Sequence, residues 1–189
     1  KMVLFYTGNV KDEAGNRETY QCMAVSKDGV TFKKKGPVVE LPEGYTAHFR
    51  DPKVWKKGSE WYMVVGAQSE DLTGKVALLR SADLKEWKHL GAIAGSGMNG
   101  LGDFGYMWEC PDLFELGGRQ VLICCPQGLP AEAERYQNLY QCGWLAGELG
   151  VVRDTEVLLD GLWRQVELLD DDDHPAGAAV LGHLADERR

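Results

Sequence analysis

Residues 20–32 read YQCMAVSKDGVTF and residues 75–87 read KVALLRSADLKEW, so one pattern recurs 55 positions later. Each copy is a strand-like run of mostly apolar residues, followed by a Ser-x-Asp turn and an aromatic residue. The recurrence continues outward to Gly36 and Gly91, which are also 55 positions apart. A fixed period of this size is typical of repeat architectures, in which one supersecondary unit packs on the next.

A second pair of stretches repeats with nearly the same period. Residues 51–55 (DPKVW) and 110–114 (CPDLF) each open a strand-like run, and they lie 59 positions apart. Each leads through a Gly-containing turn into a strongly apolar run, at residues 61–65 in one unit and 121–125 in the other. One unit therefore holds about four short strands. Almost nothing before Gly150 reads as a good helix.

Four-stranded units in series predict a β-propeller, in which each blade packs on its neighbour. Residues 1–150 hold about 2.7 units of this period, whereas a closed propeller needs about four blades or more. The predicted fold class is therefore all-β, a partial propeller over residues 1–150. No blade pattern is visible in residues 151–189, which we expect to form a loop or a short helix near 178–186. There the acidic run 170–173 beside His174 favours a solvated loop over a cation site.

The composition restricts the classes of function. The chain has 189 residues, 44% hydrophobic and 26% charged, which is ordinary for a globular domain. A net charge of −8 argues against nucleic acid as a partner, and no apolar run is long enough to predict a membrane span. Five cysteines without framework spacing favour reduced thiols and a cytoplasmic protein. Adjacent Cys124 and Cys125 favour two small apolar core residues over a zinc or redox motif.

Two carboxyl groups stand out by the sequence motifs that surround them. Glu109 lies in WECPD at residues 108–112, where the neighbouring aromatic residues predict a partly apolar site that suits a general acid. Asp51 lies in FRDPKVW at residues 49–55, next to Arg50, whose charge we expect to keep Asp51 ionised. Two such carboxyls suggest chemistry on a glycosidic bond.

These motifs resemble glycoside hydrolase family 32, the β-fructofuranosidases, and within that family the bacterial sucrose-6-phosphate hydrolases and invertases. The resemblance covers residues 3 to about 149. An Arg-Asp-Pro and a Glu-Cys-Pro in this order, one blade apart, are specific together. The matching stretches are YTGN at 6–9, HFRDPKVW at 48–55, GSGMNG at 95–100 and MWECPDLF at 107–114.

The resemblance implies a fold and a set of roles. The family has a five-bladed propeller followed by a β-sandwich, so this chain is expected to be a partial propeller without the sandwich. Glu109 would be the general acid/base, and Asp51 would hold fructose hydroxyls and stabilise the transition state. Arg50 would add a charged hydrogen bond, and Tyr6 and Thr7 would line the sugar site. No metal and no organic cofactor is implied.

Four further residues have an expected role that follows from their neighbours in the sequence. Trp108 and Tyr106 are expected to line the pocket, because they lie beside Glu109 in the sequence. Gln68 ends a predicted strand near the channel, and sugar contact and a structural role stay equally open for it. His48 is interpreted as a structural neighbour of the site rather than as a proton carrier.

The chain departs from the family pattern in one respect that bears on activity. The family nucleophile is an Asp in a Trp-Met-Asn-Asp-Pro-Asn-Gly motif, which does not occur among these 189 residues. We therefore expect a fragment that is inactive alone, from a parent that cleaves the fructosyl bond of sucrose or sucrose 6-phosphate with retention. A five-bladed glycosidase of other specificity and a non-catalytic sugar-binding remnant remain alternatives. The expected partner is a small sugar, with self-association through open blade edges.

Overall fold

A computed structural model describes residues 1–138, 140–152 and 156–165 of the chain. Every regular element in these ranges is a β-strand. A search of these ranges for a helix long and apolar enough to cross a membrane gives none. The predicted helix near residues 178–186 and the acidic run 170–173 lie outside the described residues.

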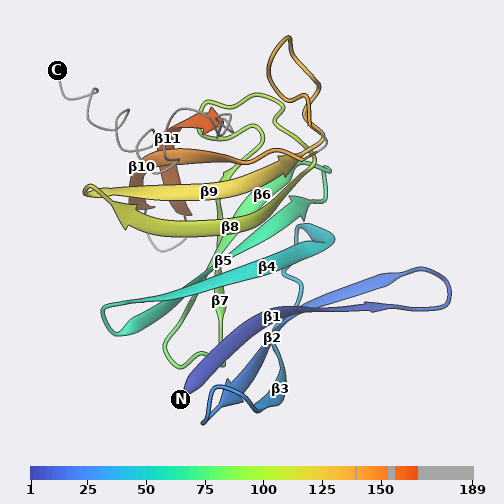
Figure 1. The fold of residues 1–189 in the computed structure, drawn as a ribbon, viewed down its shortest axis with the longest axis vertical. Helices are drawn as coiled ribbons and strands as arrows, with labels where there is room; N and C mark the ends of the chain where they lie inside the picture. Colours follow the sequence, from blue (N-terminus) through green and yellow to red (C-terminus); the bar gives the residue numbers. More distant parts are fainter. Residues whose placement is uncertain (139, 153–155, 166–189) are drawn as a thin grey trace, which may run out of the picture.

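The strands form three antiparallel sheets that follow one another along the molecule (Figure 1). The first sheet has the order β1-β2-β3, with β1 (Met2–Lys11), β2 (Arg17–Ser26) and β3 (Phe32–Val39). The second has the order β4-β5-β6-β7, with β4 (Tyr45–Lys57), β5 (Glu60–Ser69), β6 (Gly74–Ser81) and β7 (Lys88–Gly95). The third has the order β11-β10-β9-β8, with β8 (Met107–Leu116), β9 (Arg119–Gln127), β10 (Gly143–Val152) and β11 (Glu156–Gln165).

This arrangement confirms the prediction of an all-β chain built from four-stranded units. The second and third sheets are complete meanders of neighbouring antiparallel strands, as propeller blades are. The first sheet contains the counterparts of β5, β6 and β7. Strand β11 lies within residues 151–189, where the sequence showed no blade pattern, and it pairs with β10 along its whole length.

The 55-residue repeat corresponds to two turns with the same hydrogen bonds, which follow β2 and β6. Ser26 Oγ accepts the amide three residues later at 2.8 Å, and Asp28 Oδ1 accepts the amide three residues later at 2.8 Å. In the second copy Ser81 Oγ and Asp83 Oδ1 accept the corresponding amides at 2.9 and 3.0 Å. Short polar side chains that bond the backbone ahead of them fix such turns. The shared Ser-x-Asp spacing therefore encodes the same chain reversal twice.

The repeated glycines mark a second shared feature, a bulge in the last strand of the sheet. The β2–β3 ladder shifts next to Gly36, and the β6–β7 ladder shifts next to Gly91. Their φ angles are 86° and 116°, in the region that glycine reaches without steric cost. The equivalent position in the two units is thus a glycine for the same reason.

The second sheet is buried on both faces, because it packs between the other two. In β5 the side chains of Met63, Val65 and Ala67 enter the core shared with the first sheet, while Val64 enters the core shared with the third. Phe5 of the first sheet contacts Trp87, which lies between β6 and β7 of the second sheet, with ring centroids 5.8 Å apart. A strand buried on both faces reads as a continuous apolar run, which explains the sequence of β5.

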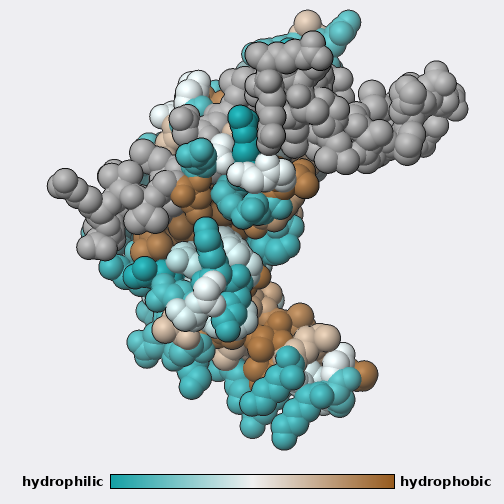
Figure 2. Space-filling view, turned by 90° about the vertical axis from the view of Figure 1, so that its left-hand side faces the viewer, coloured by the Kyte–Doolittle hydropathy of each residue, from teal (hydrophilic) through white to brown (hydrophobic). Residues whose placement is uncertain are grey.

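The outer face of the first sheet remains open. Met2, Leu4 and Val10 alternate along one face of β1 and are 50%, 44% and 55% exposed. Phe5, which points to the opposite face, packs against the core shared with the second sheet. Figure 2 shows apolar side chains at the lower end of the molecule, where Figure 1 places β1–β3. This is the largest set of exposed apolar side chains on one described strand.

Candidate active site

Strands β4 and β8 carry the same backbone irregularity at corresponding positions. The β4–β5 ladder breaks just after Arg50, and the β8–β9 ladder breaks just after Glu109. The next residue has a positive φ in both strands, 65° at Asp51 and 49° at Cys110. Non-glycine residues rarely adopt this conformation, and bulges re-aim the side chains beside them. Next to the repeated bulge, Arg50 bonds Glu109 and Asp51 bonds the backbone of Cys110, so the two strands contact each other there.

The carboxyl group of Glu109 is held from both sides. Arg50 donates from Nη2 and Nε to Oε1, at 2.7 and 3.0 Å. Gln127, at the end of β9, donates its side-chain amide to Oε2. The side chains of Arg50 and Glu109 are 25% and 23% exposed, so the ion pair is partly shielded from water. Charge-assisted bonds of this kind fix orientation as well as supplying energy.

His48 supports Arg50 from the solvent side. Its Nδ1 lies 2.9 Å from Arg50 Nη1. Burial lowers the pKa of His48, and the charges of Arg50 and Arg17 lower it further. A neutral imidazole whose Nδ1 carries no proton can accept a guanidinium hydrogen bond at this distance. His48 thus lies beside the site and orients a residue that contacts Glu109.

Asp51 lies where all three sheets meet. Its backbone amide donates to Thr7 Oγ1 of β1 at 3.0 Å, and its Oδ2 accepts the backbone amide of Cys110 in β8 at 3.0 Å. Thr7 in turn donates to Gln21 Oε1 at 3.0 Å. Gln21 is wholly buried and donates to the carbonyl of Phe49 at 2.9 Å. A chain of hydrogen bonds therefore positions Asp51 against the residue that directly follows Glu109.

The partner of Arg50 differs from the sequence-based expectation. The charge of Arg50 was expected to act on its neighbour Asp51, whereas the ion pair of Arg50 is with Glu109. Adjacent residues of a strand point to opposite faces, and the bulge at Asp51 turns that carboxylate toward the β8 backbone instead. The surroundings of Glu109 are therefore polar, made by Arg50 and Gln127.

Trp108 is a core residue and does not line a pocket, contrary to the expectation from its place beside Glu109. It is 0% exposed, and its Nε1 donates to the carbonyl of Phe104 at 2.8 Å. The rings of Trp108 and Phe104 meet edge to face at 6.2 Å. Because side chains alternate along β8, Trp108 enters the core between the second and third sheets while Glu109 faces away from it.

The sugar-lining role of Tyr6 stays a prediction, and the contacts of Gln68 favour the structural one of its two open roles. Tyr6 follows Phe5 on β1 and points to the opposite face from Phe5 and Thr7. Gln68 is 6% exposed, and its amide is used within the protein. It donates to the carbonyl of Tyr106 at 2.8 Å, and its oxygen accepts from the Thr46 hydroxyl at 3.0 Å.

Tyr106 lines an open cavity of about 630 Å³, whose lining does not include Glu109, Arg50 or Asp51. The cavity is lined by polar groups that include Asp71, Lys75 and Ser96. Tyr106 is 47% exposed, and its ring covers Gly128, the residue after Gln127. Burial lowers the pKa of Lys75, whose ammonium donates to the carbonyl of Ser96.

Gln127 contacts Glu109 but was not predicted from the sequence. It is 18 positions from Glu109 and carries no motif of its own. The signal for it is the 59-residue repeat, because Gln68 and Gln127 are 59 positions apart at the ends of β5 and β9.

Among the described residues there is no group of His, Cys, Asp and Glu arranged to hold a metal ion.

Comparison with protein families gives one match, over residues 1–171, to the N-terminal domain of the glycosyl hydrolases of family 32. Over 149 residues the chain is 64% identical to a sucrose-6-phosphate hydrolase of Bacillus subtilis, covering 79% of this chain and 31% of that protein. It is 57% identical to a sucrose-6-phosphate hydrolase of Salmonella typhimurium, with 32% of that protein covered. The chain thus spans about a third of the length of these relatives.

Solved structures of a β-fructofuranosidase and of a sucrose-6-phosphate hydrolase are similar to this chain. A β-fructofuranosidase of Bombyx mori, solved in complex with sucrose, matches with a TM-score of 0.76 and 42% identity, over 87% of this chain and 35% of that chain. A sucrose-6-phosphate hydrolase of Lactobacillus gasseri matches with a TM-score of 0.71 and 32% identity, over 88% and 32% respectively. Sequence and fold therefore agree on the family.

Proposed function

The chain belongs to the glycosyl hydrolases of family 32, and on that premise we propose that it forms the acid/base side of a site that cleaves the fructosyl bond of sucrose or sucrose 6-phosphate. The observation that carries the proposal is the convergence of Glu109, Arg50 and Asp51 at the matched bulges of β4 and β8. The names of its relatives support the substrate class. The activity belongs to the whole protein, of which this chain represents a part.

We assign the acid/base role to Glu109. As acid it gives a proton to the glycosidic oxygen that leaves fructose, and as base it then takes a proton from the attacking water. Arg50 and Gln127 hold its two oxygens, so the carboxyl has a fixed direction before a sugar arrives. In this proposal Arg50 donates its hydrogen bonds to hydroxyl groups of the bound sugar instead of to Glu109. Oε1 of Glu109 is then free to carry the proton.

We assign sugar binding to Asp51. Its Oδ2 accepts the Cys110 amide, so Oδ1 is the oxygen that we expect to accept a fructose hydroxyl. A retaining glycosidase also needs a nucleophilic carboxylate about 5–5.5 Å from the acid. Because Asp51 is engaged with the β8 backbone and the Asn-Asp-Pro-Asn motif does not occur in the chain, we leave the nucleophile unassigned. The chain alone is then a fructoside binder without turnover.

Titration calorimetry of the chain with fructose, sucrose and sucrose 6-phosphate tests this proposal. We expect sucrose to bind, and Glu109→Gln and Asp51→Asn to weaken that binding at least about tenfold. Glu60→Gln is the matched control, because Glu60 pairs with Arg80 at the opposite end of β5. Equal binding by all variants would contradict the assigned site, and no binding by the wild type would contradict the function.

A parallel assay for glucose release from sucrose separates binding from turnover. Release no greater than that of Glu109→Gln is the expected result. Release above that level would refute the claim that the chain alone is inactive, and it would support the assignment of Glu109. Comparison of sucrose with its 6-phosphate decides which of the two is preferred.

The proposal extends to the setting of the protein. All five cysteines are free, which supports a reducing, cytoplasmic compartment.

The exposed apolar side chains of Met2, Leu4 and Val10 on β1 support self-association through the first sheet. Light scattering at increasing protein concentration tests this, and a monomer at all concentrations would contradict it.

A further inference from the structure

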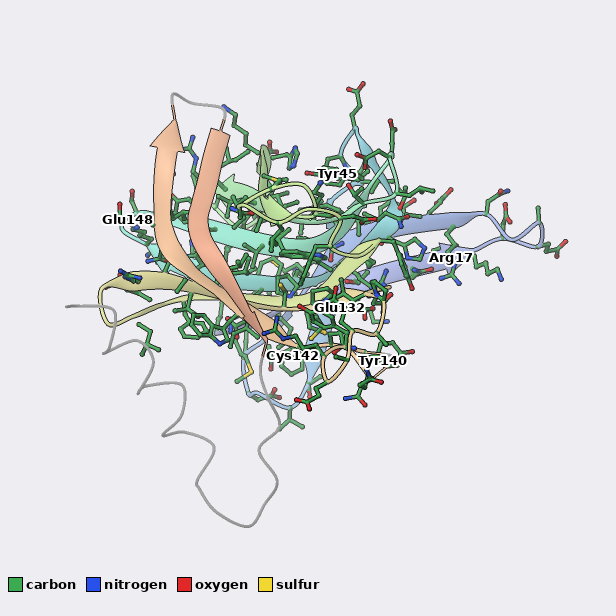
Figure 3. The ribbon with its side chains drawn as sticks, turned by 90° about the horizontal axis from the view of Figure 1, so that it is seen from above. Arg17, Tyr45, Glu132, Tyr140, Cys142 and Glu148 are labelled. Carbon is green, nitrogen blue, oxygen red and sulfur yellow. The ribbon has the colours of Figure 1, made fainter. Side chains whose placement is uncertain are left out.

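Two cysteines face each other across neighbouring strands of the third sheet. In the β9–β10 ladder Gly143 lies opposite Cys124, and an isolated bridge joins Tyr140 to Gln127. Both pairs belong to the same antiparallel register. Cys142, which lies between them in the chain, is therefore placed directly opposite Cys125. Figure 3 shows Cys142 at the start of β10, close to Tyr140.

The two thiols influence each other. The interaction between their side chains is the largest cause of the pKa shift of each thiol. Directly opposed residues of an antiparallel pair have Cβ atoms about 4.5–5.5 Å apart, and a disulfide needs about 3.5–4.5 Å. A shift of about 1 Å or less therefore closes the gap. Cys142 is exposed to solvent and Cys125 is half-buried, so a small oxidant has access to the pair.

We propose that Cys125 and Cys142 form a peroxide-sensitive dithiol, which closes to a disulfide between β9 and β10 next to the Glu109 site. Cys125 lies opposite Glu109 in the β8–β9 ladder. Gln127, two residues further along β9, holds the Glu109 carboxyl. The inference depends on the register of β9 and β10 and not on the proposed hydrolase activity.

The two thiols have different chemical roles in this reaction. The hydrogen bond from Cys125 lowers the pKa of Cys142 to about 7, and the backbone amide of Gly143 also lowers it. The same hydrogen bond raises the pKa of Cys125. Cys142 is therefore the thiolate that attacks, since a thiol with a pKa near ambient pH reacts fastest, and Cys125 is the thiol that resolves the product.

The oxidation balances in two steps with a hydroperoxide as the oxidant. The Cys142 thiolate attacks one oxygen of hydrogen peroxide, the O–O bond breaks, and hydroxide leaves, which gives a sulfenic acid on Cys142. The Cys125 sulfur then attacks the Cys142 sulfur. The S–O bond breaks, the Cys125 proton goes to the departing oxygen, and water leaves. The hydroxide of the first step takes up the proton that Cys142 lost on becoming a thiolate. In total, two thiols are oxidised to a disulfide while one peroxide is reduced to two waters.

The other cysteines are arranged differently. The Cys110 thiol points to Asp51, with Sγ 3.7 Å from Oδ2. Cys124 is wholly buried in the core between the second and third sheets. Cys22 lies on β2 in the first sheet, away from the pair. The geometry thus favours one disulfide among the pairings that five cysteines allow.

The test is peroxide treatment of the full chain, followed by thiol counting in denaturant and by peptide mapping. We expect five free thiols before treatment and three afterwards, with one cross-linked peptide pair that contains Cys125 and Cys142. Dithiothreitol is expected to restore the original count. Five thiols after treatment, or a disulfide that joins any other pair, would overturn the proposal.

Single variants check the order of the two steps. Cys125→Ser is expected to leave Cys142 as a sulfenic acid that dimedone traps. Cys142→Ser is expected to show neither a trapped sulfenic acid nor an intramolecular disulfide. Cys22→Ser is the matched control and is expected to keep the cross-link. Dimedone capture on Cys125 rather than on Cys142 would contradict the assigned roles, and the mapping of the wild-type chain tests the disulfide even if a variant does not fold.

Discussion

Arg50 and Glu109 occupy equivalent positions in successive sheets, 59 residues apart, and they form an ion pair with 2.7 Å between Nη2 and Oε1. A bulge directly follows each of them. The residue after each has a positive φ and precedes a proline. The repeated backbone therefore brings two different side chains face to face. One structural unit, used twice, builds the two halves of the candidate site.

Loss of the Arg50 guanidinium should weaken sugar binding. Arg50→Gln removes both hydrogen bonds to Glu109 Oε1 and leaves that carboxyl partly buried without its charged partner. We expect the calorimetric Kd for sucrose to rise about tenfold, which corresponds to ~1.4 kcal/mol. Lys53→Gln is the matched control. Its ion pair with Asp112 spans the same 59 residues but is about half exposed, so we expect little change.

The backbone of β8 approaches β5 so closely that residue 66 must be glycine. A Cβ at Gly66 would lie 2.3 Å from the carbonyl oxygen of Trp108 and 3.3 Å from Glu109 Cα. We expect Gly66→Ala to lower the free energy of unfolding by about 1–3 kcal/mol, because neither backbone can move without shifting a packed core. Gly102→Ala meets no atom within 4 Å and is the control. Equal urea midpoints for the two variants would contradict this account.

Trp108 should affect stability rather than recognition. Trp108→Phe leaves the Phe104 carbonyl without its buried donor and leaves a void, so we expect a loss of about 1–3 kcal/mol in thermal or urea unfolding. Tyr106→Ala, at the exposed cavity, should change sucrose affinity with a much smaller effect on the unfolding midpoint. If Trp108→Phe instead reduced affinity at full stability, Trp108 would be a binding residue.

The Ser-x-Asp turns should add stability that depends on pH. Backbone hydrogen bonds, first that from Thr31, hold the pKa of Asp28 below its ordinary value of 3.8. A lowered folded-state pKa stabilises the protein above pH 3.8 and loses this effect as the pH falls toward the folded value. We therefore expect Asp28→Asn to reduce the urea midpoint at pH 7, with the difference from the wild type shrinking below pH 3.8. A difference that is constant with pH would contradict the role of the charge.

The alkylation of Cys142 should follow its pKa. The Cys125 hydrogen bond lowers that pKa to about 7. The rate of reaction with iodoacetamide should therefore rise as the pH increases through about 7 and level off above it. Peptide mapping of the native protein measures this rate residue by residue. Cys125→Ala removes the donor and should move the rise to higher pH.

The repeat was enough to predict the fold class. The Ser-x-Asp turns, the paired glycines and the Pro-containing strand openings are local features, each set by the chemistry of a few neighbouring residues. Because they recur with a fixed spacing, they indicated four-stranded units, and the structure confirms them. Strand β11 was missed, since no Ser-x-Asp turn or Gly-marked bulge repeats beyond residue 150.

The candidate site was only partly predictable. The motifs identified Glu109, Asp51 and Arg50, and the structure brings all three together with Thr7. Adjacency in sequence was a poor guide to the pocket, because neighbours on a strand point in opposite directions. Trp108 therefore lies in the core, while Gln127, far away in sequence, contacts Glu109.

The sequence by itself determined the repeating unit, the turn chemistry and the carboxyl-bearing motifs, because these depend on residues close together along the chain. The tertiary structure alone decided which side chains meet. That Arg50 pairs with Glu109 rather than with Asp51, and that Cys142 faces Cys125, follows from bulges and ladder register. Register is set by how whole strands pack, and a shift of one residue would turn every side chain to the other face.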